Sequence, residues 1–147
     1  MMPVIVVGAD TPEGAVIIDR LYSPDREVRV FVTDESTGLE LKKRGFKVAI
    51  GDVSDESHVE AASTRCFSAV LIGRAADDDR LRSFADNADQ VLRSWANAVT
   101  NSKVRRVIWV TSRPQPEVGA SEVAQVDPGD PDLAEKVYSL DEAAILG

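Results

Sequence analysis

Glycines and polar residues follow the first apolar run of the chain in the stretch VIVVGADTPEG, residues 4–14. In a dinucleotide-binding turn the first glycine allows a tight bend, the second lets the backbone approach the diphosphate, and the third lets the helix pack on the strand. Gly8 and Gly14 fit the first and third roles, and Thr11 stands at the middle position. We therefore expect a nucleotide site that the Thr11 side chain and the charge of Asp10 weaken, although the N–H groups of the helix start favour an anion. The alternative is a plain turn whose glycines serve geometry alone.

Polar residues also follow the second and third apolar runs. Thr33 and Asp34 come after VRVFV, where an acid accepts from a ribose 2'-hydroxyl and a basic residue pairs with a 2'-phosphate. Because this turn holds no lysine or arginine, we expect NAD rather than NADP, although Asp34 fits a helix cap equally well. Gly51 and Asp52 come after FKVAI, at the expected adenine position, where Asp52 either reaches the adenine amino group or starts a turn. The candidate cofactor-binding residues are Gly8, Asp10, Thr11, Pro12, Gly14, Thr33, Asp34, Gly51, Asp52 and Val53.

Other kinds of site have little support in the sequence. No His, Cys or carboxylate cluster has metal-ligand spacing, so we expect no metal. The single cysteine, Cys66, precedes an apolar run and is expected in the core. The single histidine, His58, is expected on the surface of a short helix beside the adenine position.

The overall composition excludes several partners. The chain has 147 residues, of which 44% are hydrophobic and 29% charged, as in an ordinary folded domain. Seventeen basic against 25 acidic residues give a formal charge of -8, which disfavours nucleic acid. The apolar runs are far shorter than a membrane span, and the start lacks a basic signal region, so we expect a cytoplasmic protein with no membrane insertion.

The apolar runs that carry these turns are unbroken, which is typical of parallel strands covered on both faces. They lie at residues 4–7, 28–32, 46–50, 69–72 and 106–110, with helical patterns between them. We predict a single α/β domain over residues 1–147, a three-layer, Rossmann-like, doubly wound parallel sheet of about five strands in the order 3-2-1-4-5.

Three segments complete the predicted architecture. An i, i+3, i+4 pattern from Leu81 to Val99 predicts one long amphipathic helix. Residues 113–130, rich in proline, glycine and acids, are expected to form a long loop over the carboxyl edge of the sheet. Residues 131–146 are expected to form a C-terminal helix capped by Asp130.

Four stretches together carry a family resemblance: VVGADTPEG, GDVSDESHVEAA, FADNADQVLRSWANAV and VRRVIWVTS. They resemble the atypical short-chain dehydrogenase/reductase superfamily, especially its NAD(P)-binding, epimerase-like members, over about residues 3–112. The resemblance is degenerate, because Thr11 breaks the G-x-x-G-x-x-G pattern. It is also truncated, since enzymes of the superfamily continue past this length into a substrate-binding region.

The resemblance implies candidates for proton transfer. Thr111 and Ser112 match a serine or threonine just beyond the fifth strand, and Tyr138 matches a tyrosine that a lysine follows four residues later. Here the lysine position holds Glu142, which lacks the positive charge that assists the tyrosine.

Three functions remain open from the sequence. The first is an NAD(P)-binding domain of the atypical short-chain type with weak or no catalysis. The second is a pseudoenzyme that binds a protein partner, or a nucleotide-sensing regulatory module, since the stretch GDVSDESHVEAASTRCFSAVLI also resembles the nucleotide-sensing domains of potassium channels and transporters. The third is a small reductase that delivers hydride from NADH to a flavin or quinone. We also expect a homodimer, because small Rossmann domains often bury an outer helix.

Overall fold

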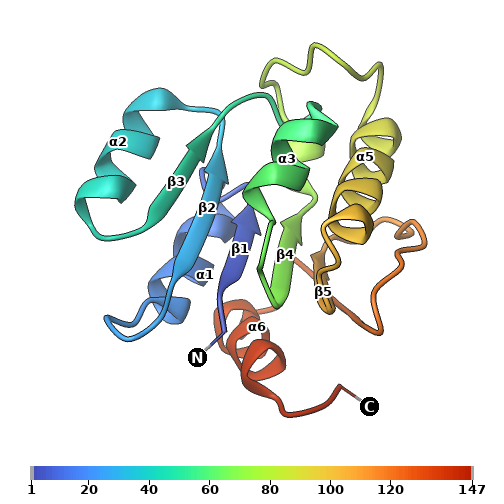
Figure 1. Ribbon diagram of the computed structural model, residues 1–147. Coiled ribbons are helices and arrows are strands. Elements are labelled where there is room, and N and C mark those ends of the chain that lie inside the picture. The colour runs from blue at the N-terminus through green and yellow to red at the C-terminus, as the bar shows by residue number, and fades with distance from the viewer. Residues whose placement is uncertain (1, 147) are drawn as a thin grey trace.

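The computed structural model describes residues 2–146, which fold around one parallel sheet (Figure 1). Within these residues the sheet has six strands. The strands are β1 (Val4–Val7), β2 (Val28–Val32), β3 (Lys47–Ile50), β4 (Ser68–Ile72), β5 (Arg106–Val110) and β6 (Glu122–Val126). Their order across the sheet is β3-β2-β1-β4-β5-β6. The predicted Rossmann-like class and the order 3-2-1-4-5 are therefore confirmed, with one further strand at the edge.

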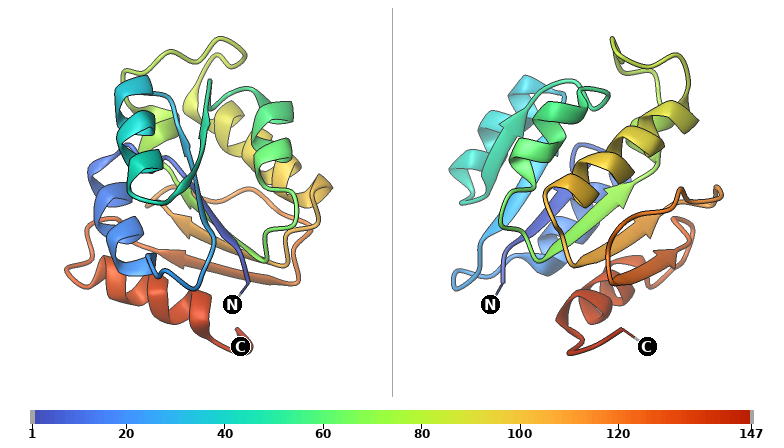
Figure 2. Two further views of the ribbon diagram at one scale, coloured as in Figure 1. Left: turned by 60° about the vertical axis from the view of Figure 1, so that its left-hand side comes forward. Right: turned by 45° about the vertical axis from the view of Figure 1, so that its right-hand side comes forward.

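Helices cover both faces of this sheet, as the two views of Figure 2 show. The helices are α1 (Pro12–Leu21), α2 (Glu35–Lys43), α3 (Glu56–Ala62), α4 (Arg74–Asp77), α5 (Ala88–Asn101) and α6 (Leu133–Glu142). One core joins a sheet face to α3 and α5, with Trp95 and Trp109 among its fully buried side chains. The other core joins the opposite face to α1 and α6 through residues such as Ile17 and Val137. Burial of both faces explains why the strands are unbroken apolar runs.

The sixth strand, β6, corrects the expected loop at residues 113–130. It pairs in parallel with β5, from Arg106 opposite Glu122 to Val110 opposite Val126. The crossover between the two strands contains no helix; instead Val118 and Ala120 pack against the core that contains α5. The proline and acid content of this segment predicts a loop. The short strand β6 forms because it pairs with β5, and the local composition does not reveal a contact between residues that are distant in sequence.

The predicted long helix begins later than its pattern indicates. The side chain of Asn87 accepts a hydrogen bond from the Gln90 N–H and caps α5. Leu81 and Phe84, which fit the apolar periodicity, lie outside the helix with 73% and 69% of their surface exposed. Hydrogen bonds from the Ser83 and Phe84 N–H groups to Asp52 and Ser54 hold this segment out of the helix.

A buried arginine fixes the C-terminal segment. Arg106 of β5 is fully buried and donates to the carbonyl oxygens of Leu140, Asp141 and Ala143 at 2.9, 2.9 and 2.6 Å. These acceptors lie at the end of α6, so the helix stops at Glu142 and not at residue 146 as expected. The helix also starts two residues later than the pattern indicates, with Asp132 in place of Asp130 at its N-cap.

Candidate functional site

The strand order creates a crevice at the carboxyl edge of the sheet. β1 lies between β2 and β4, and the chain leaves β1 and β4 toward opposite faces of the sheet. In open α/β sheets such a reversal of strand order opens a ligand-binding crevice. The candidate cofactor-binding residues lie in the turns that follow β1, β2 and β3 or, for Pro12 and Gly14, in the first turn of α1, so the fold brings them to one edge.

The turn after β1 leaves no room for side chains at its two glycines. Gly8 has φ +91°, and a Cβ there would lie 2.9 Å from the Cβ of Ala75. A Cβ on Gly14 would lie 2.4 Å from the carbonyl oxygen of Gly8. Both glycines are therefore required by the close packing of β1, α1 and α4.

Thr11, at the position of the missing glycine, makes both of its side-chain hydrogen bonds within the turn. Its hydroxyl accepts from the Gly14 N–H at 2.9 Å and donates to the Gly8 carbonyl at 2.7 Å. It is the N-cap of α1, and Pro12 follows at the first helical position. The side chain that replaces glycine thus satisfies one N–H group that an anion would otherwise reach.

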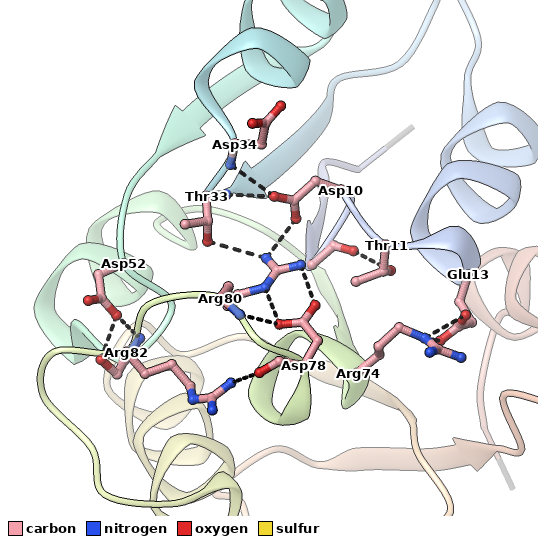
Figure 3. A network of polar contacts seen from close by, with 12 residues as sticks. Asp10, Thr11, Glu13, Thr33, Asp34, Asp52, Arg74, Asp78, Arg80 and Arg82 are labelled. Carbon is pink, nitrogen blue, oxygen red and sulfur yellow. Dashed lines mark hydrogen bonds and ion pairs between the residues drawn. The ribbon is translucent and has the colours of Figure 1, made fainter.

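Asp10 links the first turn to the second. One carboxylate oxygen accepts from the backbone N–H groups of Thr33 and Asp34 at 2.8 and 3.0 Å. The other accepts from Arg80 at 2.8 Å, and Arg80 also donates to the Thr33 hydroxyl at 3.2 Å (Figure 3). The side chains of Asp10 and Arg80 are only 5% and 10% exposed, so this ion pair is largely shielded from water.

Asp34 serves as the cap that its position allows. Its side chain accepts from the Thr37 N–H at 2.9 Å and is the N-cap of α2. Hydrogen bonds from Thr37 and Ser36 hold its pKa below the ordinary carboxyl value. The carboxylate remains exposed to solvent, so capping does not remove it from a ligand's reach.

The turn after β3 packs against two aromatic rings. A Cβ on Gly51 would lie 2.4 Å from the Nδ1 atom of His58, whose ring lies edge-on to Phe31. His58 is thus half-buried behind the turn and not on the open surface as expected. The indole Nε1 of Trp95 donates to the Val53 carbonyl at 2.8 Å, a positioning contact that the apolar stripe of α5 does not predict.

The segment of residues 78–86, which we call the strap, lies across this edge. Arg80 anchors one end to Asp10, and two 2.8 Å hydrogen bonds to Asp78, within the strap itself, orient its guanidinium. Further along, the Ser83 N–H donates to Asp52 at 2.8 Å and the Phe84 N–H donates to the Ser54 hydroxyl at 3.0 Å. The strap therefore joins the turns after β1, β2 and β3 (Figure 3).

Of the candidate proton-transfer residues, Tyr138 lies apart from Thr111 and Ser112. Thr111 follows β5, and its buried hydroxyl accepts from the Arg113 N–H at 3.0 Å. Thr111 and Ser112 line a hollow of about 210 Å³ together with Gly73 and Glu13. Tyr138 instead stacks its ring 3.4 Å from the guanidinium carbon of Arg20.

Arg20 belongs to the last turn of α1. Because α1 runs away from the carboxyl edge, its last turn lies about 12–15 Å from the turn after β1. Glu142, at the lysine position, pairs with Arg26 at 3.0 Å. The structure thus places Thr111 and Ser112 at the crevice and Tyr138 outside it.

The family model for NAD(P)H-binding proteins matches residues 8–138, which is most of the chain. The chain belongs to the NAD(P)H-binding family. No curated protein sequence matches it.

Solved structures share the fold of this NAD(P)H-binding domain at low sequence identity. The anaerobillin reductase ChuY from Escherichia coli O157:H7 is 23% identical with a TM-score of 0.58, over 75% of this chain and 50% of that one. The Citrobacter triphenylmethane reductase in complex with NADP(H) is 15% identical, TM-score 0.61, over 74% and 36%. The enzyme WbmG from Bordetella bronchiseptica in complex with NAD is 20% identical, TM-score 0.59, over 75% and 37%. The NAD(P)H-binding domain thus spans half or less of the length of these proteins.

The described residues form neither a metal-ligand cluster nor a membrane-spanning helix. Within residues 2–146, no three His, Cys, Asp or Glu side chains gather as metal ligands would. None of the helices in the same range has the length and apolarity that a membrane crossing requires.

Acid is expected to loosen the strap of this NAD(P)H-binding domain before the core unfolds. Burial raises the pKa values of Asp52 and Asp78, but hydrogen bonds to Asp52 and the Arg80 contacts of Asp78 outweigh it, so both lie below the ordinary carboxyl value. The stability that these carboxylates supply is complete above that ordinary value and is lost as the pH falls through the lowered pKa values. Amide hydrogen exchange should therefore show the Ser83 N–H keeping its protection from neutral pH down to about pH 4 and losing it as the pH falls further.

The control for this measurement is the N–H of Ile5, in the fully buried strand β1. It should keep its protection while Ser83 loses it. Loss of both in one step would show that the strap has no acid-sensitive opening of its own.

Proposed function

We propose that the chain binds NAD(H) along the carboxyl edge of its sheet and has weak or no hydride-transfer activity of its own. The observation that carries the proposal is that the strap joins the turns after β1, β2 and β3 at the crevice beside β1 and β4. These are the turns that hold the diphosphate, the adenosine ribose and the adenine in a dinucleotide fold.

Each part of the cofactor has a proposed position. The diphosphate lies at the first turn of α1, over the Thr11 cap. The adenosine ribose lies at Thr33 and Asp34, and the adenine lies at Gly51, Asp52 and Val53. The nicotinamide end then points toward Thr111 and Ser112, beside the 210 Å³ hollow.

Binding in this pose requires the strap to move. The strap covers the adenosine half through hydrogen bonds to Asp10, Asp52 and Ser54. It carries Leu81 and Phe84 in solvent, so its opening removes few apolar contacts with the core, among them that of Ala85. We therefore propose an opening and closing strap over the adenosine half.

NAD(H) is proposed over NADP(H) on the balance of charge. Asp10, Asp34, Asp52 and Asp78 all lie at this edge, while Arg80 already pairs with two of them. A 2'-phosphate would meet this excess of negative charge, whereas a ribose hydroxyl would find carboxylate acceptors.

Weak or absent catalysis is proposed because the described residues place no tyrosine–lysine pair at the crevice. Tyr138 stacks on Arg20 at the far end of α1, and the Thr111 hydroxyl is held by a backbone N–H. Conventional proton transfer to a carbonyl substrate lacks its donor in this arrangement.

A second candidate is hydride delivery to a flavin or quinone, which needs positioning more than a proton donor. The hollow between Gly73, Thr111 and Glu13 offers a place beside the proposed nicotinamide position. Several proteins of similar fold carry reductase names, including a quinone oxidoreductase from Escherichia coli.

Calorimetric titration with NAD, NADH, NADP, NADPH and ADP tests the proposal. We expect micromolar binding of NAD or NADH, weaker binding of the 2'-phosphorylated forms, and ADP binding that shows the adenosine half to be engaged. NADH oxidation with a flavin or quinone would favour the second candidate. Failure of every dinucleotide to bind at millimolar concentration would contradict both and favour a protein-interaction module.

A further inference from the structure

The Asp10 carboxylate occupies a complete anion site at the end of β2. Its ligands are two backbone N–H groups, from Thr33 and Asp34, and one guanidinium N–H, from Arg80. Backbone amides together with arginine are the donors that proteins use for phosphate. The bound anion here is a side chain of the chain itself, and it is nearly buried.

This site lies where a dinucleotide fold distinguishes NAD from NADP. The 2' position of the adenosine ribose faces the end of the second strand, and a basic residue there accommodates a 2'-phosphate. The turn after β2 contains no basic residue, but the fold brings Arg80 to it from 47 positions further along the chain. An unpaired Arg80 would therefore favour NADP(H), whereas an Arg80 already paired with carboxylates would not.

The charge of Arg80 is neutralised by two carboxylates. Asp78 accepts two parallel hydrogen bonds of 2.8 Å from it, and Asp10 accepts a hydrogen bond from the remaining Nη1 at 2.8 Å. Of these two acids, only Asp10 also takes the N–H groups of Thr33 and Asp34. A 2'-phosphate would have to displace Asp10, while an unmodified ribose would not.

We infer that Asp10 is the specificity-determining residue of the proposed site, an internal anion that excludes a 2'-phosphate and so selects NAD(H). The inference rests on the proposed function for its ligand. Its further consequence is that removal of the Asp10 carboxylate leaves two N–H groups and Arg80 free to receive a phosphate. The Asp10→Ser variant thus becomes a receptor for 2'-phosphorylated nucleotides.

The test compares 5'-AMP with adenosine 2',5'-bisphosphate, two probes that differ only by the 2'-phosphate. Wild type is expected to bind the bisphosphate no more tightly than 5'-AMP. Asp10→Ser should bind the bisphosphate at least about tenfold more tightly than wild type does, as expected for charge-assisted hydrogen bonds, with 5'-AMP affinity within about threefold.

Two controls isolate the site from charge alone. Asp25→Ser removes the same charge from an exposed position in the turn between α1 and β2, away from the carboxyl edge, and should behave as wild type. The double variant Asp10→Ser, Arg80→Met should lose the gain, because it removes the guanidinium donor. Far-ultraviolet circular dichroism and thermal unfolding confirm that each variant is folded.

A less disruptive variant keeps the test decisive if Asp10→Ser does not fold. Asp10→Asn retains the size and one oxygen acceptor but removes the charge, and it should bind the bisphosphate at least about threefold more tightly than wild type. Absence of any gain in the folded variants, or tighter binding of the bisphosphate than of 5'-AMP by wild type, would overturn the inference. If wild type binds no dinucleotide but Asp10→Ser gains the bisphosphate, the proposed function fails and the anion site stands.

Discussion

Replacing Arg106 with methionine is expected to lower the free energy of unfolding by about 3–5 kcal/mol, the usual cost of removing one partner of a buried ion pair. Arg106 is fully buried, and Glu122 of β6 accepts from it at 3.0 Å. Methionine fills much of the volume but leaves Glu122 without its buried partner. It also removes the donor that holds the carbonyls at the end of α6. Urea denaturation at equilibrium measures the loss.

The neighbouring arginine provides a matched control. Arg105 also pairs with Glu122, at 3.4 Å, but its side chain is 65% exposed. Because exposed ion pairs contribute little, Arg105→Met should leave the unfolding midpoint nearly unchanged. Equal losses in the two variants would contradict the view that burial, and not the charge of Glu122, makes Arg106 important.

Replacing Gly14 with alanine is expected to destabilise the fold by about 2 kcal/mol or more and to reduce nucleotide affinity at least about tenfold. Alanine alone would favour a helix over glycine by about 1 kcal/mol, so the expected sign is opposite to helix propensity. The reason is that the new Cβ would lie 2.4 Å from the Gly8 oxygen and 2.6 Å from the Ala9 Cα, which are backbone atoms. α1 must shift, and the amides of its first turn shift with it.

Gly129→Ala is the control for this prediction. A Cβ there meets only the Asp127 side chain, at 3.2 Å, in an exposed turn. The unfolding free energy should change by less than about 0.5 kcal/mol, and nucleotide affinity should stay the same. A stabilised Gly14→Ala variant would show that α1 does not pack on the turn as closely as described.

The sequence predicts the sheet because its strands are buried on both faces. Runs such as VIVV and RVIWV need no tertiary information to be recognised, and the order 3-2-1-4-5 follows from crossover rules. The same reasoning does not predict β6. Its sequence EVAQV alternates apolar and polar residues, and within the described residues this strand pairs with a neighbour on one side only. The start of α5 is also not predicted correctly. Apolar residues of the strap fit the helical period, but the N–H groups of Ser83 and Phe84 bond to Asp52 and Ser54 instead of to a helix.

The candidate site, like the fold, can be predicted from the sequence only in part. Residues at strand ends, such as Asp10, Thr33 and Asp52, can be placed at one edge from topology alone. Arg80 cannot, because it lies just before the predicted helix that begins at Leu81, and the periodicity of that helix does not show which turns Arg80 contacts. The sequence does show two arginines in the acidic stretch DDDRLR. They point to a role at the site only once the strap is known to cross the carboxyl edge.

Amide chemical-shift mapping during titration with NADH tests most directly whether NAD(H) binds at the carboxyl edge, beneath the strap. We expect coincident shifts in residues 8–14, 33–34 and 51–54 and in the strap, with one common affinity. Shifts confined to the hollow of about 490 Å³ between β6 and α6, lined by Val126, Lys136 and Leu140, would contradict it. So would the absence of shifts at saturating NADH.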